Sequence, residues 1–347
     1  MPITKEMEAR IRNWFSVFSL LVFVLSWRVS SLNGVERAAV YVDLGINYYE
    51  MGQYEKAVEK FQKALEIDPD YPQLHGLLGS AFLQRGKIDQ AIKAYERQIV
   101  LAPTVAQCHF NLGLAYWRKG LLEEAIGRFE RAVELDGRLV RAHRALGSIH
   151  MEQGNLSKAI SAFKTTVFLD PSSWEDYYNL GLAFYGQRNY EEATRSYQRA
   201  LGLNPEGTEI HVALGKTYFE LGKVDLALRR YRNALRINPQ DIQVRFMVAE
   251  ILASQDRFDE SIAQYEAILK IDPNNAEVLN NLGVIYFKRK SYKKALRYLL
   301  KATEIDPNID YIHNNLGLLY AAMGMHEKAT DEFEKAIAAS ERKASSP

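Results

Sequence analysis

The sequence predicts an all-α protein, an α-solenoid of nine 34-residue helix–turn–helix repeats that follows an N-terminal transmembrane helix. Three observations predict this fold. A Leu-Gly pair recurs at a period of 34 residues, apolar residues at helical spacing surround each pair, and a long uncharged segment precedes the first repeat. A period of 20–50 residues is typical of structures built by stacking one small unit. Such stacks present extended surfaces, so the pattern favours binding over catalysis.

The uncharged segment lies near the N-terminus. Fifteen uncharged residues separate Arg12 from Arg28, and a helix of that length spans about 22 Å, short of the roughly 30 Å hydrocarbon core. Continuing to Leu32, with Arg28 extending to the interface, brings the helix close to twenty residues. A tryptophan stands near each end, where interfacial tryptophans are common. We therefore predict a transmembrane signal-anchor helix over 13–32.

Two other interpretations of this segment stay open. A cleavage site after Ser31 would make it a signal peptide, although Arg28 lies awkwardly within such a site. A buried capping helix would need a polar face, whereas this segment is apolar on all sides.

The flanking charges bear on the orientation of the predicted helix. Lys5, Arg10 and Arg12 precede it, whereas Arg28 and Arg37 follow it. Basic residues are retained on the cytoplasmic side, so this small excess favours a cytoplasmic N-terminus. We expect a single-pass protein of a bacterial inner membrane whose repeats face the periplasm.

Each repeat reads as two helices joined by a turn. With Ala38 counted as position 1, positions 4, 7, 8 and 11 lie on one face of a first helix, and positions 20, 24 and 27 on one face of a second. Glycine at position 15 suits a left-handed residue just past a helix end, and proline at position 32 stops the second helix.

The predicted segments are a tail at 1–12, the anchor at 13–32, a linker at 33–37, repeats at 38–71, 72–105, 106–139, 140–173, 174–207, 208–241, 242–275, 276–309 and 310–343, and a tail at 344–347.

The glycine at position 8 lies inside the first helix, where it costs about 0.5–1 kcal/mol relative to alanine. Its recurrence in eight repeats indicates a close approach of the two helices, and we expect the small alanine at position 20 to lie opposite it. Repeat seven has Ala249 and Ser261 at these positions, so we expect different packing there.

These residues resemble the tetratricopeptide repeat (TPR) family, in which a large residue, Leu-Gly, Tyr, Ala, Phe, Ala and Pro follow one another at this spacing. The resemblance covers residues 38 to about 343. It implies a right-handed superhelix whose first helices line a concave groove. It also implies a protein-binding module without a reaction or cofactor of its own.

Composition excludes several functions. The 44 basic and 43 acidic residues leave a net charge of +1, so no global field favours nucleic acid. A single cysteine, Cys108, excludes an internal disulfide, and no catalytic or phosphate-binding motif occurs. We expect no enzyme activity.

Histidine is the one metal-ligand residue that recurs. Five histidines occupy position 4: His75, His109, His143, His211 and His313. Zinc holds each nitrogen at about 2.0–2.1 Å, whereas packed helices lie roughly 8–10 Å apart. We therefore expect no metal site and interpret these histidines as packing residues between repeats.

The resemblance places positions 2, 5, 6, 9, 12 and 13 of each repeat in the groove. Apolar and aromatic residues gather there in repeats three to five, three arginines add a basic spot that suits an acidic residue of a partner, and asparagines at position 6 can hold a bound backbone. Packing between repeats is the alternative role for the aromatic residues. The predicted partner-binding residues are Phe110, Asn111, Leu114, Trp117, Arg118, Arg141, Arg144, Tyr178, Asn179, Leu182, Tyr185, Phe219, Asn281, Phe287 and Asn315.

These observations predict a membrane-tethered scaffold that binds an apolar or extended protein segment and supports assembly of a complex. Two alternatives stay open. One is a self-assembling coat formed by end-to-end stacking through the last repeat, where Phe333 and Ile337 remain apolar while Thr330 and Ala339 depart from the repeat pattern. The other is a substrate-recruiting subunit of an enzyme complex.

Overall fold

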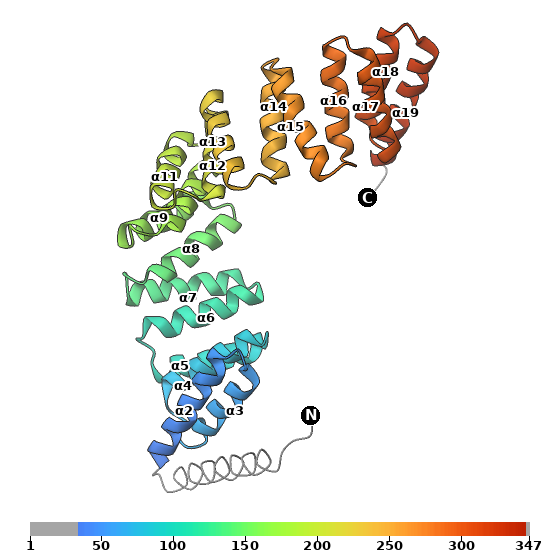
Figure 1. The fold of residues 1–347 in the computed structure, drawn as a ribbon. Helices are drawn as coiled ribbons and strands as arrows, with labels where there is room; N and C mark the ends of the chain where they lie inside the picture. Colours follow the sequence, from blue (N-terminus) through green and yellow to red (C-terminus); the bar gives the residue numbers. More distant parts are fainter. Residues whose placement is uncertain (1–33, 345–347) are drawn as a thin grey trace, which may run out of the picture. The chain divides into compact units, whose positions relative to one another are not determined.

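The structure is a computed structural model that describes residues 34–344. Eighteen α-helices and no strand occur in this range, and they form nine helix pairs of the predicted kind. Figure 1 shows the helices in chain order. The all-α repeat fold is thereby confirmed. Between residues 34 and 344, no helix combines the length and the apolar character needed to cross a bilayer. The predicted anchor at 13–32 lies outside the described residues.

The helices divide into two compact units. Unit 1 holds repeats one to four and unit 2 holds repeats five to nine. The helices of unit 1 are α2 (Gly34–Glu50), α3 (Tyr54–Leu65), α4 (Pro72–Gln84), α5 (Ile88–Leu101), α6 (Ala106–Lys119), α7 (Leu122–Leu135), α8 (Val140–Glu152) and α9 (Leu156–Leu169). Those of unit 2 are α10 (Trp174–Gly186), α11 (Tyr190–Leu203), α12 (Thr208–Glu220), α13 (Val224–Ile237), α14 (Ile242–Ser254), α15 (Phe258–Ile271), α16 (Ala276–Lys288), α17 (Tyr292–Ile305), α18 (Asp310–Ala322) and α19 (His326–Ala344). Helix α2 begins at Gly34, so most of the segment predicted as a linker is helical.

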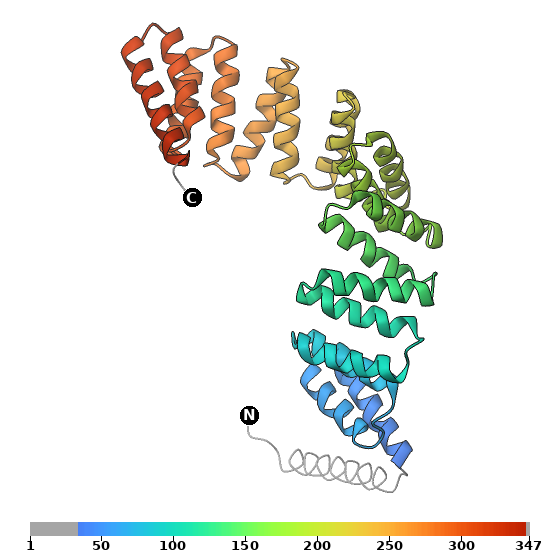
Figure 2. The ribbon, with the colours of Figure 1, turned by 180° about the vertical axis from the view of Figure 1, so that it is seen from behind.

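The apolar core runs through each unit as a series of local clusters. In unit 1, Phe61 and Leu74 belong to one cluster, and Phe129 and Ile149 belong to the next. In unit 2, side chains from α14 to α19 form the corresponding clusters, and Figure 2 shows these helices side by side. Within each unit, neighbouring helix pairs therefore bury apolar side chains against one another.

The turn inside each repeat uses a left-handed residue at position 15. The six glycines at this position have φ values between 68° and 82°, which confirms the expected conformation. Arg188, Asp256 and Lys290 hold the same position in repeats five, seven and eight, with φ values of 60°, 57° and 59°. A residue with a side chain is disfavoured in this conformation, yet three repeats adopt it without glycine. The backbone geometry of the turn is therefore the same in all nine repeats, whereas the residue type varies.

The close approach of the two helices expected at position 8 is confirmed, and the side chain at position 24, which the prediction did not name, is the group nearest the glycine. A Cβ atom on Gly147 would lie 2.6 Å from the Phe163 ring, and the other repeats place their position-24 side chain in the same way. The glycine leaves room for an aromatic ring, because the ring extends further across the helix interface than an alanine methyl group. Repeat seven differs as expected, since the Ser261 hydroxyl donates to the Ala249 carbonyl at 2.7 Å.

The position-4 histidines bind the loops that join repeats. Each Nε2–H donates to the carbonyl oxygen of the residue six positions earlier, and in repeat three His109 reaches the Pro103 carbonyl at 2.9 Å. Arg245 takes this role in repeat seven and donates to the Pro239 carbonyl at 2.8 Å. Each histidine thus contacts a separate loop.

Polar contacts also connect neighbouring repeats on their outer turns. In repeats two, three, four and eight, the side chain at position 14 bonds to position 18 of the preceding repeat, as in the pairs Lys119–Asp89 at 2.8 Å and Arg289–Asp259 at 2.5 Å. These pairs are exposed and contribute little individually, but they recur at fixed register.

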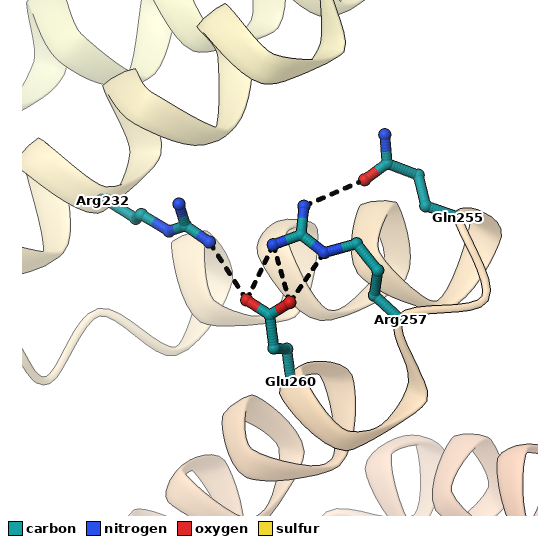
Figure 3. Close-up of polar contacts among 4 residues, drawn as sticks. All are labelled: Arg232, Gln255, Arg257 and Glu260. Atoms are coloured by element: carbon teal, nitrogen blue, oxygen red, sulfur yellow. Dashed lines mark hydrogen bonds and ion pairs between the residues drawn. The ribbon is translucent and has the colours of Figure 1, made fainter.

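Repeats six and seven share an additional ionic contact, shown in Figure 3. Arg257 of repeat seven donates to both carboxylate oxygens of Glu260, at 2.7 and 2.8 Å, and Arg232 of α13 approaches the same carboxylate at 3.3 Å. Hydrogen bonding to Arg257 lowers the pKa of Glu260. This group therefore stays ionised and joins α13 to α15 beside the irregular repeat.

Candidate partner-binding site

Two adjoining pockets lie along the first helices of repeats five to seven in unit 2. The first has a volume of about 460 Å³ and lies between α10 and α12, and the second has a volume of about 550 Å³ and lies between α12 and α14. Tyr185 and Lys216 line both pockets, so the two are neighbours. The first pocket is lined by Tyr178, Leu182, Tyr185, Tyr197, Thr208, Glu209, Val212, Ala213, Lys216 and Asp241. The second is lined by Tyr185, Lys216, Phe219, Glu220, Tyr231, Met247, Glu250, Ile251 and Ser254.

The helical repeat explains why these residues converge. Tyr178, Leu182 and Tyr185 occupy positions 5, 9 and 12 of α10, spaced by three and four residues, so they share one helix face. Lys216 and Phe219 occupy positions 9 and 12 of α12, so the same face is presented one repeat later. Because the first helices of successive repeats stack, the same repeat positions line one continuous surface.

The second helices contribute a buried tyrosine to each pocket. Tyr197 is 1% exposed and Tyr231 is 2% exposed, and their rings fill the spaces left by Gly181 and Gly215. Neither hydroxyl has a hydrogen-bond partner among the described residues. Burial raises the pKa of both phenols well above the usual value. Both hydroxyls are therefore neutral and able to donate.

The equivalent tyrosines of other repeats are already bonded. The Tyr95 hydroxyl lies 3.0 Å from the Ser80 hydroxyl, and the Tyr265 hydroxyl accepts from Asn281 Nδ2 at 3.1 Å. The partners Ser80 and Asn281 lie on first helices, so a tyrosine hydroxyl at position 24 reaches the surface formed by the first helices. In the two pockets, no side chain of the described residues covers that surface.

Several charged side chains in the pockets have no ion-pair partner in the part of the chain that the structure describes. Lys216 has no ion pair or hydrogen bond with the described residues, and Glu209 and Glu250 have none either. Burial raises the pKa of Glu250, and the nearby carboxylate of Glu277 raises it further. Glu220 accepts a long hydrogen bond of 3.4 Å from Tyr190. Carboxylates thus outnumber ammonium groups around the second pocket.

Four of the predicted groove residues meet in these pockets: Tyr178, Leu182, Tyr185 and Phe219. Phe219 is 47% exposed, which is unusual for an aromatic side chain of a core-forming helix. Asn179 is half-buried on the same helix but does not line either pocket.

The predicted residues of unit 1 contact one another instead. Arg141 donates to the Gln107 side chain at 2.6 Å, and Gln107 donates to Asn111 at the same distance. The Arg141 guanidinium also lies 5.2 Å from the centre of the Phe110 ring, which is only 6% exposed. Trp117 donates to Glu152 at 3.2 Å. These side chains hold repeats three and four together.

The remaining predicted residues of unit 1 are also engaged. Arg118 donates to the Leu83 carbonyl at 3.4 Å, and Leu114 packs against the apolar cluster of repeats three and four. Arg144 is half-buried and has an interaction partner of its own.

The predicted asparagines near the C-terminus form a chain of side-chain amides. Asn315 donates to Asn280 at 2.8 Å, Asn280 donates to Asn281 at 3.1 Å, and Asn281 donates to Tyr265. Phe287 packs near Tyr292, with ring centres 6.0 Å apart. The amide chain orders the first helices of repeats eight and nine.

Comparison with known families supports the repeat assignment. A TPR model described as the cilia and flagella-associated protein 70 C-terminal domain matches residues 72–272 and again residues 138–346, and a TPR repeat model matches residues 45–84. The chain belongs to the TPR family. The long model matches twice in overlapping registers, as expected when both model and chain are repetitive, and neither model describes an enzyme.

Solved TPR structures share the fold. The C-terminal part of a TPR repeat-containing protein from Cytophaga hutchinsonii is 21% identical over 69% of this chain and 98% of its own, with a TM-score of 0.62. PilF from Pseudomonas aeruginosa is 21% identical over 63% of this chain and 100% of its own, with a TM-score of 0.54. YrrB, a TPR protein with an unusual peptide-binding site, is 27% identical over 52% of this chain and 92% of its own, with a TM-score of 0.45. No curated protein matches the sequence.

Sequence reasoning missed most of the residues that line these two pockets, including two tyrosines and two charged residues. Tyr197 and Tyr231 follow the core pattern of position 24, and Lys216 and Glu250 occupy groove position 9 without an obvious role. The tyrosines at position 24 could have indicated the site from the sequence, because the hydroxyl of a buried tyrosine needs a hydrogen-bond partner and phenylalanine needs none. Tyrosine replaces phenylalanine at position 24 in four TPR repeats, and two of the four hydroxyls are bonded within the fold.

Residues 34–344 contain no group of three or more potential metal ligands that could hold an ion. Cys108 is buried, and burial raises the pKa of its thiol, which disfavours the nucleophilic thiolate. What the pockets offer is apolar surface, hydroxyl donors and unpaired charges.

Proposed function

We propose that this TPR protein is a non-catalytic scaffold that binds an extended segment of a partner protein in the two pockets of unit 2. One observation carries the proposal: the hydroxyls of two tyrosines whose rings are buried reach adjoining aromatic pockets and have no hydrogen-bond partner among the described residues. A bound segment that accepts hydrogen bonds from these hydroxyls gains free energy at a partly desolvated site. Protein partners recognised in this way support assembly of a complex.

The proposal includes a membrane tether. The segment at 13–32, whose one charged residue is Arg28, is the candidate anchor, and one residue separates it from α2 at Gly34. An anchor this close to the first repeat keeps the scaffold near the bilayer. The flanking charges favour the periplasmic side for the repeats, and the predicted boundaries of anchor and tails belong to this proposal.

Crosslinking in native membranes followed by mass spectrometry tests the partner site. We compare the full chain with Phe219→Ala, which removes an exposed ring from the second pocket, and with Phe168→Ala as a matched control. Phe168 is 83% exposed on α9 and lines neither pocket. We expect recovery of the crosslinked partner to fall about tenfold for Phe219→Ala, as for an aromatic anchor of an interface, and to stay unchanged for Phe168→Ala. Equal recovery from both variants would exclude these pockets as the partner site.

An exposed apolar residue on the last helix supports a second candidate function, end-to-end assembly. Ile337 of α19 is 60% exposed, whereas a terminal repeat normally presents a polar outer face. Sedimentation of the full chain in detergent decides between the two functions. The scaffold function predicts a single monomeric species at high concentration, and larger species that Ile337→Ser abolishes would favour the coat.

A further inference from the structure

The carboxylates of the two pockets lie at different helix ends, and this difference identifies the class of segment that the pockets accept. The first pocket places one carboxylate, Glu209, and the Lys216 ammonium around an apolar wall of Tyr178, Leu182 and Val212. Its remaining carboxylate, Asp241, already accepts the Val244 N–H at 3.0 Å as a helix cap. Glu209 and Asp241 both lie at helix N-termini, whose partial positive charge compensates the two carboxylates, so apolar contact dominates this pocket.

The second pocket has an excess of negative charge. Glu220 and Glu250 face it together with Lys216, and the aromatic rings of Tyr185, Phe219 and Tyr231 complete its walls. Aromatic ring faces attract cations, and a cation between carboxylates also gains Coulomb energy. The carboxylate of Glu277 adds to the negative potential, because it raises the pKa of Glu250 beyond the effect of burial.

The acidic character extends along the first helices of unit 2. In repeats five to eight, the positions that correspond to the groove hold five glutamates and two lysines, although the whole chain has a net charge of only +1. The glutamates are Glu175, Glu209, Glu220, Glu250 and Glu277, and the lysines are Lys216 and Lys288. Long-range attraction therefore favours a basic segment on this surface.

The hydroxyls fix how the segment lies. Tyr197 and Tyr231 are equivalent residues of consecutive repeats, and each donates from the base of one pocket. Such donors suit main-chain carbonyl groups of an extended chain. The axes of packed helices lie roughly 8–10 Å apart and an extended chain advances about 3.3 Å per residue, so neighbouring pockets receive side chains about three residues apart.

We propose that the pockets of unit 2 bind an extended peptide segment that places an apolar side chain in the first pocket and a lysine or arginine side chain, about three residues away, in the second. This inference rests on the proposed scaffold function and specifies its partner. It differs from the acidic partner expected for the arginines of repeats three and four, whose Arg118 and Arg141 are engaged within unit 1.

Fluorescence polarisation with three labelled peptides tests the inference on the full chain in detergent. Each peptide has twelve residues in a Gly-Ser background. One carries Leu and Arg three residues apart, one carries Leu and Glu at that spacing, and one carries Leu and Arg seven residues apart. We expect the first peptide to bind at least tenfold tighter than the other two.

Three variants connect the result to the pockets. Glu250→Lys should reverse the preference so that the Glu peptide binds more tightly, and lysine is compatible with this position because Lys216 is its equivalent in repeat six. Tyr231→Phe should weaken binding of the Leu-Arg peptide about three- to tenfold, the usual effect of one lost hydrogen bond. Tyr265→Phe is the matched control, since that hydroxyl is bonded to Asn281, and it should leave binding unchanged. Circular dichroism verifies that each variant is folded.

The outcomes separate this inference from the proposed function. Equal or tighter binding of the Glu peptide, an unchanged preference in Glu250→Lys, or no measurable binding of any peptide would overturn the basic-segment inference. The scaffold function would survive each of these results if partner recovery from membranes still depended on Phe219. Loss of that dependence would overturn the proposed function itself.

Discussion

Glycine at position 8 and the large side chain at position 24 act as one packing unit. A Cβ atom on the glycine would lie 2.4–2.7 Å from the facing side chain in eight repeats, closer than real Cβ contacts. The glycine is therefore required by the ring that it accommodates, and the helix accepts its unfavourable backbone entropy. Repeat seven keeps Tyr265 opposite Ala249, so its two helices are adjusted, and the Ser261 hydrogen bond to the Ala249 carbonyl accompanies that adjustment.

We predict opposite effects for alanine at two helical glycines of unit 1. Gly147→Ala should destabilise the protein by about 1–2 kcal/mol, because overpacking against Phe163 outweighs the gain in helix propensity. Gly127→Ala should stabilise it by about 0.5–1 kcal/mol, because nothing lies within 4 Å of the added methyl group. Urea unfolding followed by circular dichroism measures both, and a stabilised Gly147→Ala would contradict the packing assignment.

The left-handed turn at position 15 gives a second residue-scale prediction. Lys290→Gly should stabilise the protein by about 0.5–1 kcal/mol, because Lys290 has a φ of 59°, which glycine adopts without steric penalty. The reciprocal change Gly222→Lys should destabilise it by about 1 kcal/mol, since only the backbone is affected where no atom lies within 4 Å. Thermal midpoints report both changes. The same sign for both variants would contradict this account.

The candidate site could be predicted only in part at this scale. Tyr178, Leu182, Tyr185 and Phe219 follow from groove positions that are read directly from the repeat register. Phe110 and Trp117 follow from the same positions, yet one is buried and the other bonds to Glu152, because neighbouring side chains decide whether a groove position is free. The register contains no information about those neighbours.

At the scale of helices and turns, the sequence predicts the fold well. The Leu-Gly pair, the glycine at position 15 and the proline at position 32 each determine backbone geometry locally, so the helix pairs could be placed without tertiary information. The contacts between repeats were less predictable. Exposed pairs such as Lys119–Asp89 and the loop contacts of the histidines depend on which positions of adjacent repeats meet, and that requires the stacking geometry.

The last helix pair contains a buried charge that makes its stability depend on pH. Glu332 is 9% exposed and lies 2.6 Å from His313 Nδ1 and 2.7 Å from Lys335 Nζ. Burial by itself raises the pKa of Glu332, but hydrogen bonds from Lys335 and His313 outweigh that effect and lower it overall. A carboxylate with a lowered pKa stabilises the fold above its ordinary pKa and loses that contribution as the pH falls through the folded value.

Glu332→Gln tests this assignment. We expect the variant to be less stable by about 1–2 kcal/mol at pH 7, because a buried hydrogen bond to a charged group is lost. The difference should close as the pH falls through the lowered pKa of Glu332, where the wild-type carboxylate becomes protonated. Glu334→Gln, an exposed neighbour on α19, is the control and should have no effect. Urea unfolding between pH 7 and pH 3 measures both, and a pH-independent difference would contradict the role of the charge.

At the scale of the whole molecule, the proposed function combines a binding surface with a tether. The surface lies in unit 2, whereas the candidate anchor precedes unit 1 in the sequence. Repeat proteins distribute stability along the chain through contacts between neighbours, so anchoring one end does not require changes in the repeats that bind.

Membrane fractionation tests the tether. The full chain should remain in the membrane pellet after alkaline carbonate extraction, because a helix of about twenty apolar residues is stable in the bilayer. A variant that lacks residues 13–32 should appear in the supernatant. Release of the full chain by carbonate would exclude a transmembrane anchor and would favour a cleaved signal peptide or a peripheral association.

The bonds between repeats have a consequence for how this chain can change in length. Each histidine at position 4 donates to the loop before it, and in repeats two, three, four and eight the position-14 side chain bonds to the preceding repeat. Removing residues 106–139 as one block would bring His143 to the Pro103 carbonyl and Gln153 to Asp89, so both of these bonds would find an equivalent acceptor. Losing one residue more or fewer would misplace both contacts. Insertions and deletions in this gene should therefore be tolerated in steps of 34 codons, and recombination between repeats can lengthen or shorten the protein without redesigning it.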